Sequence, residues 1–213
     1  MRSLRFGIPA LLALASAAPL SGQLLESRRA FEPAVSLWIG PTIFGPRVSV
    51  GGQDYSYSSS VSLGMRAERS ITRRAGIMGD VSVAPLSKIS QRSAISRSDS
   101  SRALVFRADA ALGWRFKPRA PVFFFAGGGI VGASRRAGPA GGSATDPEVT
   151  YGLGYDGSSG GAGGWNFRAG YQGHVVFPGK PPAAAAESAQ PVARSSTHDF
   201  SIQLGARYTF SRR

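Results

Sequence analysis

The strongest constraint on the fold is a strict period-two alternation in the segment 200–210, near the C-terminus. One set of alternate positions is apolar or aromatic, and the set between them is polar or small. Successive side chains of a strand point to opposite faces, so this pattern predicts a strand with one apolar and one polar face. The apolar set comprises Phe200, Ile202, Leu204, Ala206, Tyr208 and Phe210, and the other set comprises Ser201, Gln203, Gly205, Arg207 and Thr209.

Most of the other candidate strands repeat this two-faced pattern, and no helix of useful length is predicted. The clearest interior example is the segment 104–116, in which a helical period would scatter Arg107 and Asp109 around the apolar side. Both faces of 122–133 are apolar or empty, so its register cannot be read. The segment 147–156 could instead be a loop, with two shorter strands between 164 and 178. The eight predicted strands are 34–43, 59–69, 77–84, 104–116, 122–133, 148–155, 165–175 and 200–210.

The predicted connections alternate in length along the chain. This is typical of an up-and-down antiparallel barrel in the outer membrane, which has short periplasmic turns and longer external loops. An even number of strands places both ends of the barrel on the periplasmic side. The long connections are 45–58, 88–101, 134–146 and 178–197, and the shorter ones are 70–75, 117–121 and 156–164.

The N-terminus has the pattern of an export signal. Arg2 and Arg5 precede an apolar core at 6–14, and small residues follow it. This core is too short to span a bilayer as a helix, and no later run reaches 18 apolar residues. The predicted organisation is a signal peptide at 1–22, a short periplasmic leader at 23–33 and the barrel at 34–210.

Composition limits the classes of partner and site. The formal net charge is +13, but no basic run exceeds two residues and no nucleic-acid motif is present, so nucleic acid is not an expected partner. The chain has no cysteine, which excludes disulfides and thiolate metal sites. The spread of single arginines fits a lumenal role or attraction to an anionic membrane surface better.

The last strand also resembles the closing strand of bacterial outer-membrane barrels, which reads polar-x-Gly-x-x-aromatic-x-aromatic. Gln203, Gly205, Tyr208 and Phe210 occupy these places in order, and the segment 211–213 departs from the pattern by following the last aromatic. The whole mature chain resembles the small OmpA/OmpX-like eight-stranded barrels. This resemblance implies an outer-membrane surface protein that contacts lipid and engages the barrel-assembly machinery through its last strand.

The resemblance to membrane barrels implies that the polar face of each strand points into the lumen. Arginine on the lipid face costs roughly 2–4 kcal/mol at the midplane, so the charged residues of the strands should face the lumen. Buried charges need partners, and we expect Asp80 and Asp109 to pair with Arg66, Arg107 or Arg115. Such side chains fill an eight-stranded barrel, so an open pore is not expected. The predicted lumenal charges are Arg66, Glu68, Asp80, Arg107, Asp109, Arg115, Arg168 and Arg207.

A soluble exported lipocalin-like binding protein is one alternative, because it too is an eight-stranded barrel. Three features favour the membrane barrel: the chain ends on a strand, the polar face mixes charges with Gly and Ser, and aromatics cluster at strand ends as in an interfacial girdle. These aromatics are Trp114, Phe116, Trp165, Tyr208 and Phe210.

A lipid-modifying barrel enzyme is the other alternative. His198 and Asp199, with Ser195, Ser196 or Ser201, are the residues that could form a nucleophile and base, although alternation puts His198 on the opposite face from Asp199. His174 falls on the predicted lumenal face. No metal-ligand spacing or phosphate loop is found, and Gly127–Gly129 more plausibly relieves crowding in a strand. The sequence predicts a non-enzymatic, monomeric protein without cofactor.

Binding is expected at the loops, which are the predicted functional surface. A cationic rim there could bind lipopolysaccharide phosphates or another anionic ligand. The basic residues of this rim are Lys88, Arg92, Arg97, Arg102, Arg135 and Arg136.

Overall fold

The structure is a computed structural model, and it describes only part of the chain. The predicted signal peptide (1–22) and most of the leader (23–33) lie outside the described residues and stay predictions. Among the described residues, no helix is long and apolar enough to cross a membrane. The described residues are 32–50, 53–91, 102–117, 120–135, 143–157, 164–179, 192–193 and 195–210.

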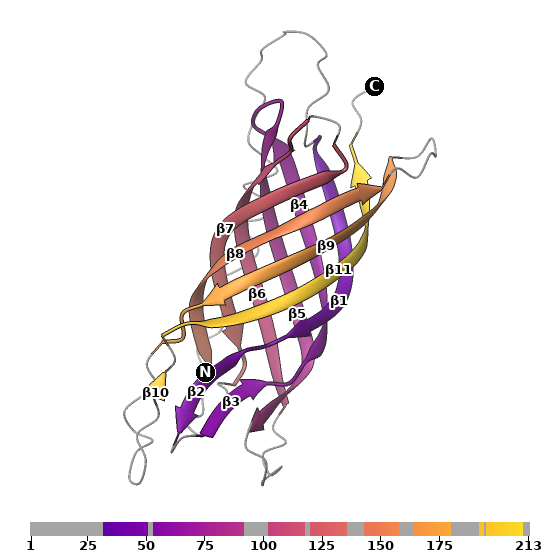
Figure 1. The fold of residues 1–213 in the computed structure, drawn as a ribbon. Coiled ribbons are helices and arrows are strands. Elements are labelled where there is room, and N and C mark those ends of the chain that lie inside the picture. The colour runs from indigo at the N-terminus through magenta and orange to yellow at the C-terminus, as the bar shows by residue number, and fades with distance from the viewer. Residues whose placement is uncertain are drawn as a thin grey trace, which may run out of the picture.

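Within these residues, eight long strands form a closed antiparallel barrel (Figure 1). Each strand pairs with the next one along the chain, and the last strand pairs with the first, with Ala34 opposite Thr209. The predicted all-β, eight-stranded up-and-down fold is therefore confirmed. The strands are β1 (Ala34–Ile43), β4 (Ser60–Ser70), β5 (Ala75–Gln91), β6 (Arg102–Trp114), β7 (Val122–Ala133), β8 (Ala144–Gly157), β9 (Trp165–Val176) and β11 (Thr197–Thr209).

Three shorter strands extend the sheet beyond one end of the barrel (Figure 1). They are β2 (Pro46–Val50), β3 (Gln53–Tyr57) and β10 (Val192–Ala193). β2 and β3 form a hairpin, and β3 pairs with the end of β5, which reaches Gln91. The prediction of an irregular loop at 45–58 was wrong, because the hairpin gains its partner from a strand distant in sequence.

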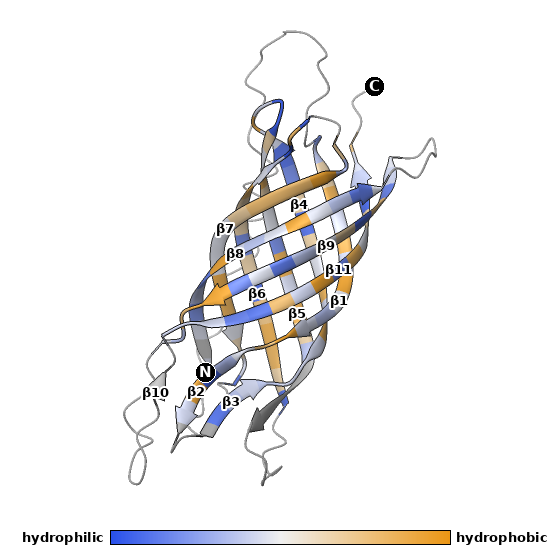
Figure 2. Cartoon of the chain, in the orientation of Figure 1, coloured by the Kyte–Doolittle hydropathy of each residue, from blue (hydrophilic) through white to orange (hydrophobic). Residues whose placement is uncertain are grey.

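The two faces of the barrel wall differ in polarity. Apolar and polar residues alternate along the strands in Figure 2, and the exposed, outward positions of the wall carry large apolar side chains. In β7, whose register the sequence left open, Phe123 and Phe125 are buried inside and Phe124 is exposed outside. Outward apolar residues include Leu37, Ile39, Leu63, Phe106, Leu112, Phe124, Ile130, Leu153, Phe167, Ile202 and Leu204.

Trp38 on β1 shows how the interior is filled. Its side chain is buried in the lumen, and its indole N–H donates a hydrogen bond to Oδ2 of Asp80 at 3.3 Å. Gly64 lies opposite Trp38 on β4, and a Cβ atom at this position would overlap the indole ring. The indole ring therefore fits in the lumen because residue 64 has no side chain.

We expect the substitution Gly64→Ala to lower the free energy of unfolding by about 1–3 kcal/mol, because the added methyl group displaces the indole. Gly157→Ala is the matched control, since a Cβ there meets Tyr155 and Phe167 at ordinary contact distances of 3.4 Å and 3.6 Å. Urea unfolding of the refolded barrel in detergent micelles measures the free energy of unfolding of both variants. Equal stability of the two variants would contradict the role assigned to Gly64.

Candidate functional site

The interior of the barrel is a polar site built from inward-facing side chains of nearly every strand. Every charged residue predicted for the lumen is buried there, with no more than 8% of its surface exposed. The strand period explains this placement, because these residues alternate with outward positions, most of which are apolar or small. The residues are Arg66, Glu68, Asp80, Arg107, Asp109, Arg115, Arg168 and Arg207.

One layer lies where β1 begins and β11 ends, and we call it the terminal layer. It joins two acids to three arginines. Arg168 bridges the acids, with its Nε 2.6 Å from Asp156 Oδ1 and its Nη1 2.8 Å from Glu68 Oε2. Arg115 pairs with Asp156, and Arg207 pairs with Glu68. The guanidinium carbons of Arg115 and Arg168 lie 4.8 Å and 4.9 Å from the centre of the Phe123 ring.

The central layer lies next along the barrel and is held by Arg66. Its Nε donates to Asp80 at 2.8 Å, and its Nη2 donates to Oε1 of Gln172 at 2.9 Å and to Oε1 of Gln203 at 3.1 Å. Gln203 donates in turn to Gln172, which donates to the Thr150 hydroxyl at 3.0 Å. This layer links β4, β5, β8, β9 and β11 across the lumen.

The mouth layer lies at the opposite end of the barrel from the terminal layer and centres on Asp199 of β11, whose side chain is fully buried. Arg47 of β2 donates to its carboxylate at 2.5 Å, Arg107 also pairs with it, and the Gly45 backbone N–H donates at 2.9 Å. The guanidinium carbon of Arg107 lies 5.5 Å from the centre of the Phe44 ring. Asp199 thus ties the segment after β1 to the last strand.

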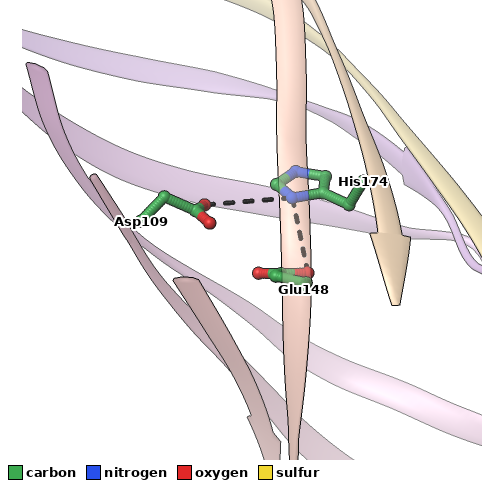
Figure 3. Close-up of side chains that lie close together, drawn as sticks. All are labelled: Asp109, Glu148 and His174. Carbon is green, nitrogen blue, oxygen red and sulfur yellow. Dashed lines mark ion pairs between the residues drawn. The ribbon is translucent and has the colours of Figure 1, made fainter. Parts of the chain in front are cut away.

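Two carboxylates and an imidazole meet beside the mouth layer (Figure 3). Nδ1 of His174 lies 3.4 Å from Glu148 Oε2 and 3.8 Å from Asp109 Oδ2. We call these three residues the acid–histidine cluster. Its members come from β6, β8 and β9, and each side chain is at most 3% exposed.

One predicted pairing of the charge ladder is formed and one is not. Arg66 pairs with Asp80 as expected. The expected pairing of Asp109 with Arg66, Arg107 or Arg115 was wrong, because these arginines meet other acids in the described part of the barrel. Arg107 turns towards Glu148 and Asp199, and Asp109 is left beside the imidazole of His174.

Four members of the lumenal ion-pair network were absent from the sequence-based set. The alternation of outward Tyr151, Leu153 and Tyr155 could have identified Glu148 and Asp156, since they occupy the opposite face of β8. Asp199 likewise shares the face of Ser201, Gln203 and Arg207. Only Arg47 carried no signal, because its segment was predicted to be a loop. The four residues are Arg47, Glu148, Asp156 and Asp199.

The residues considered for catalysis are separated by the strand period. His198 is exposed on the outer face, where its ring stacks near Phe200 at a centroid distance of 6.4 Å. Asp199 and Ser201 point into the barrel and are buried. His198 and Asp199 therefore do not form the nucleophile and base arrangement. His174 lies in the lumen, on the face that the sequence predicted.

The residues that resemble an assembly signal fall on both faces of β11. Gln203 is buried in the central layer, and Gly205 lies opposite Trp38, where a Cβ atom would overlap the β1 backbone. Tyr208 and Phe210 point outwards and pack edge to face, with ring centroids 5.2 Å apart. The two aromatics form part of the outer surface at the end of the strand.

No protein-family model matches the chain, and no curated protein matches it significantly. Among solved structures, it is similar to Neisserial surface protein A (13% identity, TM-score 0.46, 85% of this chain and 97% of that chain). It is also similar to the outer membrane protein OprG from Pseudomonas aeruginosa (8%, TM-score 0.45, 87% and 99%). A third similar structure is Ail, the attachment invasion locus protein of Yersinia pestis (15%, TM-score 0.42, 84% and 99%). These likenesses are of the barrel fold.

We expect Glu68→Gln to lower the free energy of unfolding by about 3–5 kcal/mol, because Arg168 and Arg207 lose a buried charged partner. Glu32→Gln removes the same charge from an exposed position and should change stability by less than about 0.5 kcal/mol. Urea unfolding of both variants in detergent provides the comparison. A loss below about 1 kcal/mol in Glu68→Gln would mean that the terminal layer is not held by ion pairs.

Proposed function

We propose that the protein is a non-enzymatic outer-membrane barrel with a filled lumen, which anchors an external extension at the cell surface. The extension consists of β2, β3 and β10, which lie beyond the barrel end (Figure 1). In this proposal the short turns lie in the periplasm and the long connections lie outside.

The observation that carries the proposal is the inverted polarity of the barrel. Charged residues such as Arg66 and Arg168 are at most 4% exposed, whereas Leu204 and Ile202 are 50% and 56% exposed on the wall. Soluble monomers rarely expose apolar patches larger than a few hundred Å². Contact with lipid removes the free-energy cost of exposing these apolar side chains to water. The membrane barrel is therefore favoured over the lipocalin-like alternative, which has an apolar interior and a polar exterior.

The packing of the lumen supports a barrel that conducts no solutes. The terminal and central layers cross the interior with direct hydrogen bonds and ion pairs. An apolar cluster then fills the mouth, and the Tyr57 hydroxyl donates to the Arg135 carbonyl at 2.8 Å across it. The cluster comprises Phe44, Tyr57, Ala84, Ala103, Val105, Val131, Ala133 and Val176.

The partners follow from the two surfaces of the barrel. The outward apolar face would contact membrane lipid, and the closing strand would engage the barrel-assembly machinery through Gln203, Gly205, Tyr208 and Phe210. Of the basic rim, Arg102 and Arg135 are exposed, in keeping with binding of lipopolysaccharide phosphates. The remaining rim side chains lie outside the described part of the chain. A single barrel closes all edges of its main sheet, which agrees with a monomer.

The membrane assignment is tested by placing an arginine on the outer face. Leu204→Arg should lower the free energy of unfolding in lipid bilayers by about 2–4 kcal/mol, because Leu204 lies in the middle of β11. Ile71→Arg is the matched control, since Ile71 is also exposed but lies in the turn after β4, where the cost is about 0–1 kcal/mol. A soluble, detergent-free monomer that tolerates both changes equally would refute the proposal.

The filled lumen is tested by electrical recording. The purified barrel, inserted into planar lipid bilayers, should give no steady single-channel conductance above that of the bare membrane, because side chains occupy the interior. A stable conductance that scales with salt concentration would show an open path and would contradict this part of the proposal.

A further inference from the structure

The acid–histidine cluster has the donor set and spacing of a metal site. It offers two carboxylate oxygens and one imidazole nitrogen, all within 4.8 Å of one another. Zinc binds such atoms at about 2.0–2.2 Å in a tetrahedron, which separates neighbouring donors by roughly 3.4 Å. Nδ1 of His174 lies 3.4 Å from Glu148 and 3.8 Å from Asp109, close to this separation.

The same three side chains are short of hydrogen bonds. Nine buried side-chain atoms in the described residues make no well-formed hydrogen bond, and five of them belong to Asp109, Glu148 and His174. Of these five, Glu148 Oε2 still has Arg107 Nε at 3.3 Å and His174 Nδ1 at 3.4 Å. Both oxygens of Asp109 are among the five, although its side chain is only 2% exposed and points into the cluster (Figure 3). Buried polar groups nearly always have hydrogen-bond partners, and a cation bound among these three side chains would provide a partner for the carboxylate oxygens and for Nδ1.

Gly129 on β7 allows the two acids to approach each other. It pairs with Asp109 of β6 on one side and with Glu148 of β8 on the other. A Cβ atom at Gly129 would overlap the Asp109 carboxylate. Because Gly129 has no side chain, the space between β6 and β8 is left to the two acids, which agrees at this position with the predicted relief of crowding.

The charges around the cluster favour a cation. Asp109, Glu148 and Asp199 supply three negative charges near the mouth, whereas Arg47 and Arg107 supply two positive ones. The nearby Arg66 and Asp80 balance each other. With His174 neutral, as a metal ligand must be, these groups carry one uncompensated negative charge, and the buried Asp146, two positions before Glu148 on β8, adds a second.

We propose that Asp109, Glu148 and His174 bind a divalent transition-metal ion inside the barrel, with zinc as the first ion to test. The imidazole donor favours zinc or a related ion over magnesium or calcium, which prefer oxygen ligands alone. The bound ion links β6, β8 and β9 across the lumen. This role is independent of the membrane environment and of any surface ligand.

Metal content of the refolded full chain tests the proposal. The barrel is refolded in detergent with zinc, with magnesium or with neither, desalted, and analysed by mass spectrometry for metal. We expect about one zinc ion per chain, no retained magnesium, and cobalt absorption bands typical of four-coordinate Co²⁺ when cobalt replaces zinc. His174→Gln and Asp109→Asn should each lose the zinc, with folding checked by heat-dependent migration in gels.

The second histidine supplies a matched control. His198→Gln should retain zinc, because His198 lies on the outer face. This variant has a single histidine, so zinc should shift the imidazole NMR signals of His174. An unshifted imidazole would overturn the proposal even if the other variants fail to fold. An equal zinc content in His174→Gln and in the unchanged chain would also overturn the proposal. So would a refolded chain that retains no zinc, in which case a bound proton would balance the negative charge of the cluster.

Discussion

The requirement that every charge inside the barrel be balanced by another governs this structure. Among the described residues, the ion pairs of the lumen involve six arginines and six carboxylates, whose formal charges cancel with His174 neutral. An isolated buried charge costs several kcal/mol, so each of these buried groups needs an oppositely charged or hydrogen-bonding partner. The balance is not local, since the terminal layer holds more arginines than acids and the mouth region holds more acids than arginines.

This electrostatic requirement and the strand period act together on the wall. Because side chains alternate between faces, most inward charges are flanked by outward apolar residues, as Arg207 is by Ala206 and Tyr208, which leaves the outer face largely apolar. A one-residue slip of any strand would exchange the two sets and break several ion pairs at once. The lumenal charges therefore help backbone pairing to fix the register of the strands.

The sequence predicted the barrel well because alternation is a local signal. The segments 34–43 and 122–133 match β1 and β7 residue for residue, and the pairing of Arg66 with Asp80 joins adjacent strands. Contacts across the lumen were harder to predict from the sequence, because they depend on the stagger of the strands and on the length of the side chains. Asp109 illustrates this, since its neighbour His174 belongs to a strand three places away around the barrel.

The link between Arg47 and Asp199 has a consequence for the order of folding. The two residues are separated by 152 positions, and Asp199 belongs to the last strand of the barrel. The hairpin of β2 and β3 pairs with β5, but its Arg47 gains the buried partner Asp199 only when the last strand has joined β9 and β1. Sealing of the mouth is therefore a late event, and the buried state of Arg47 reports that the barrel wall has closed.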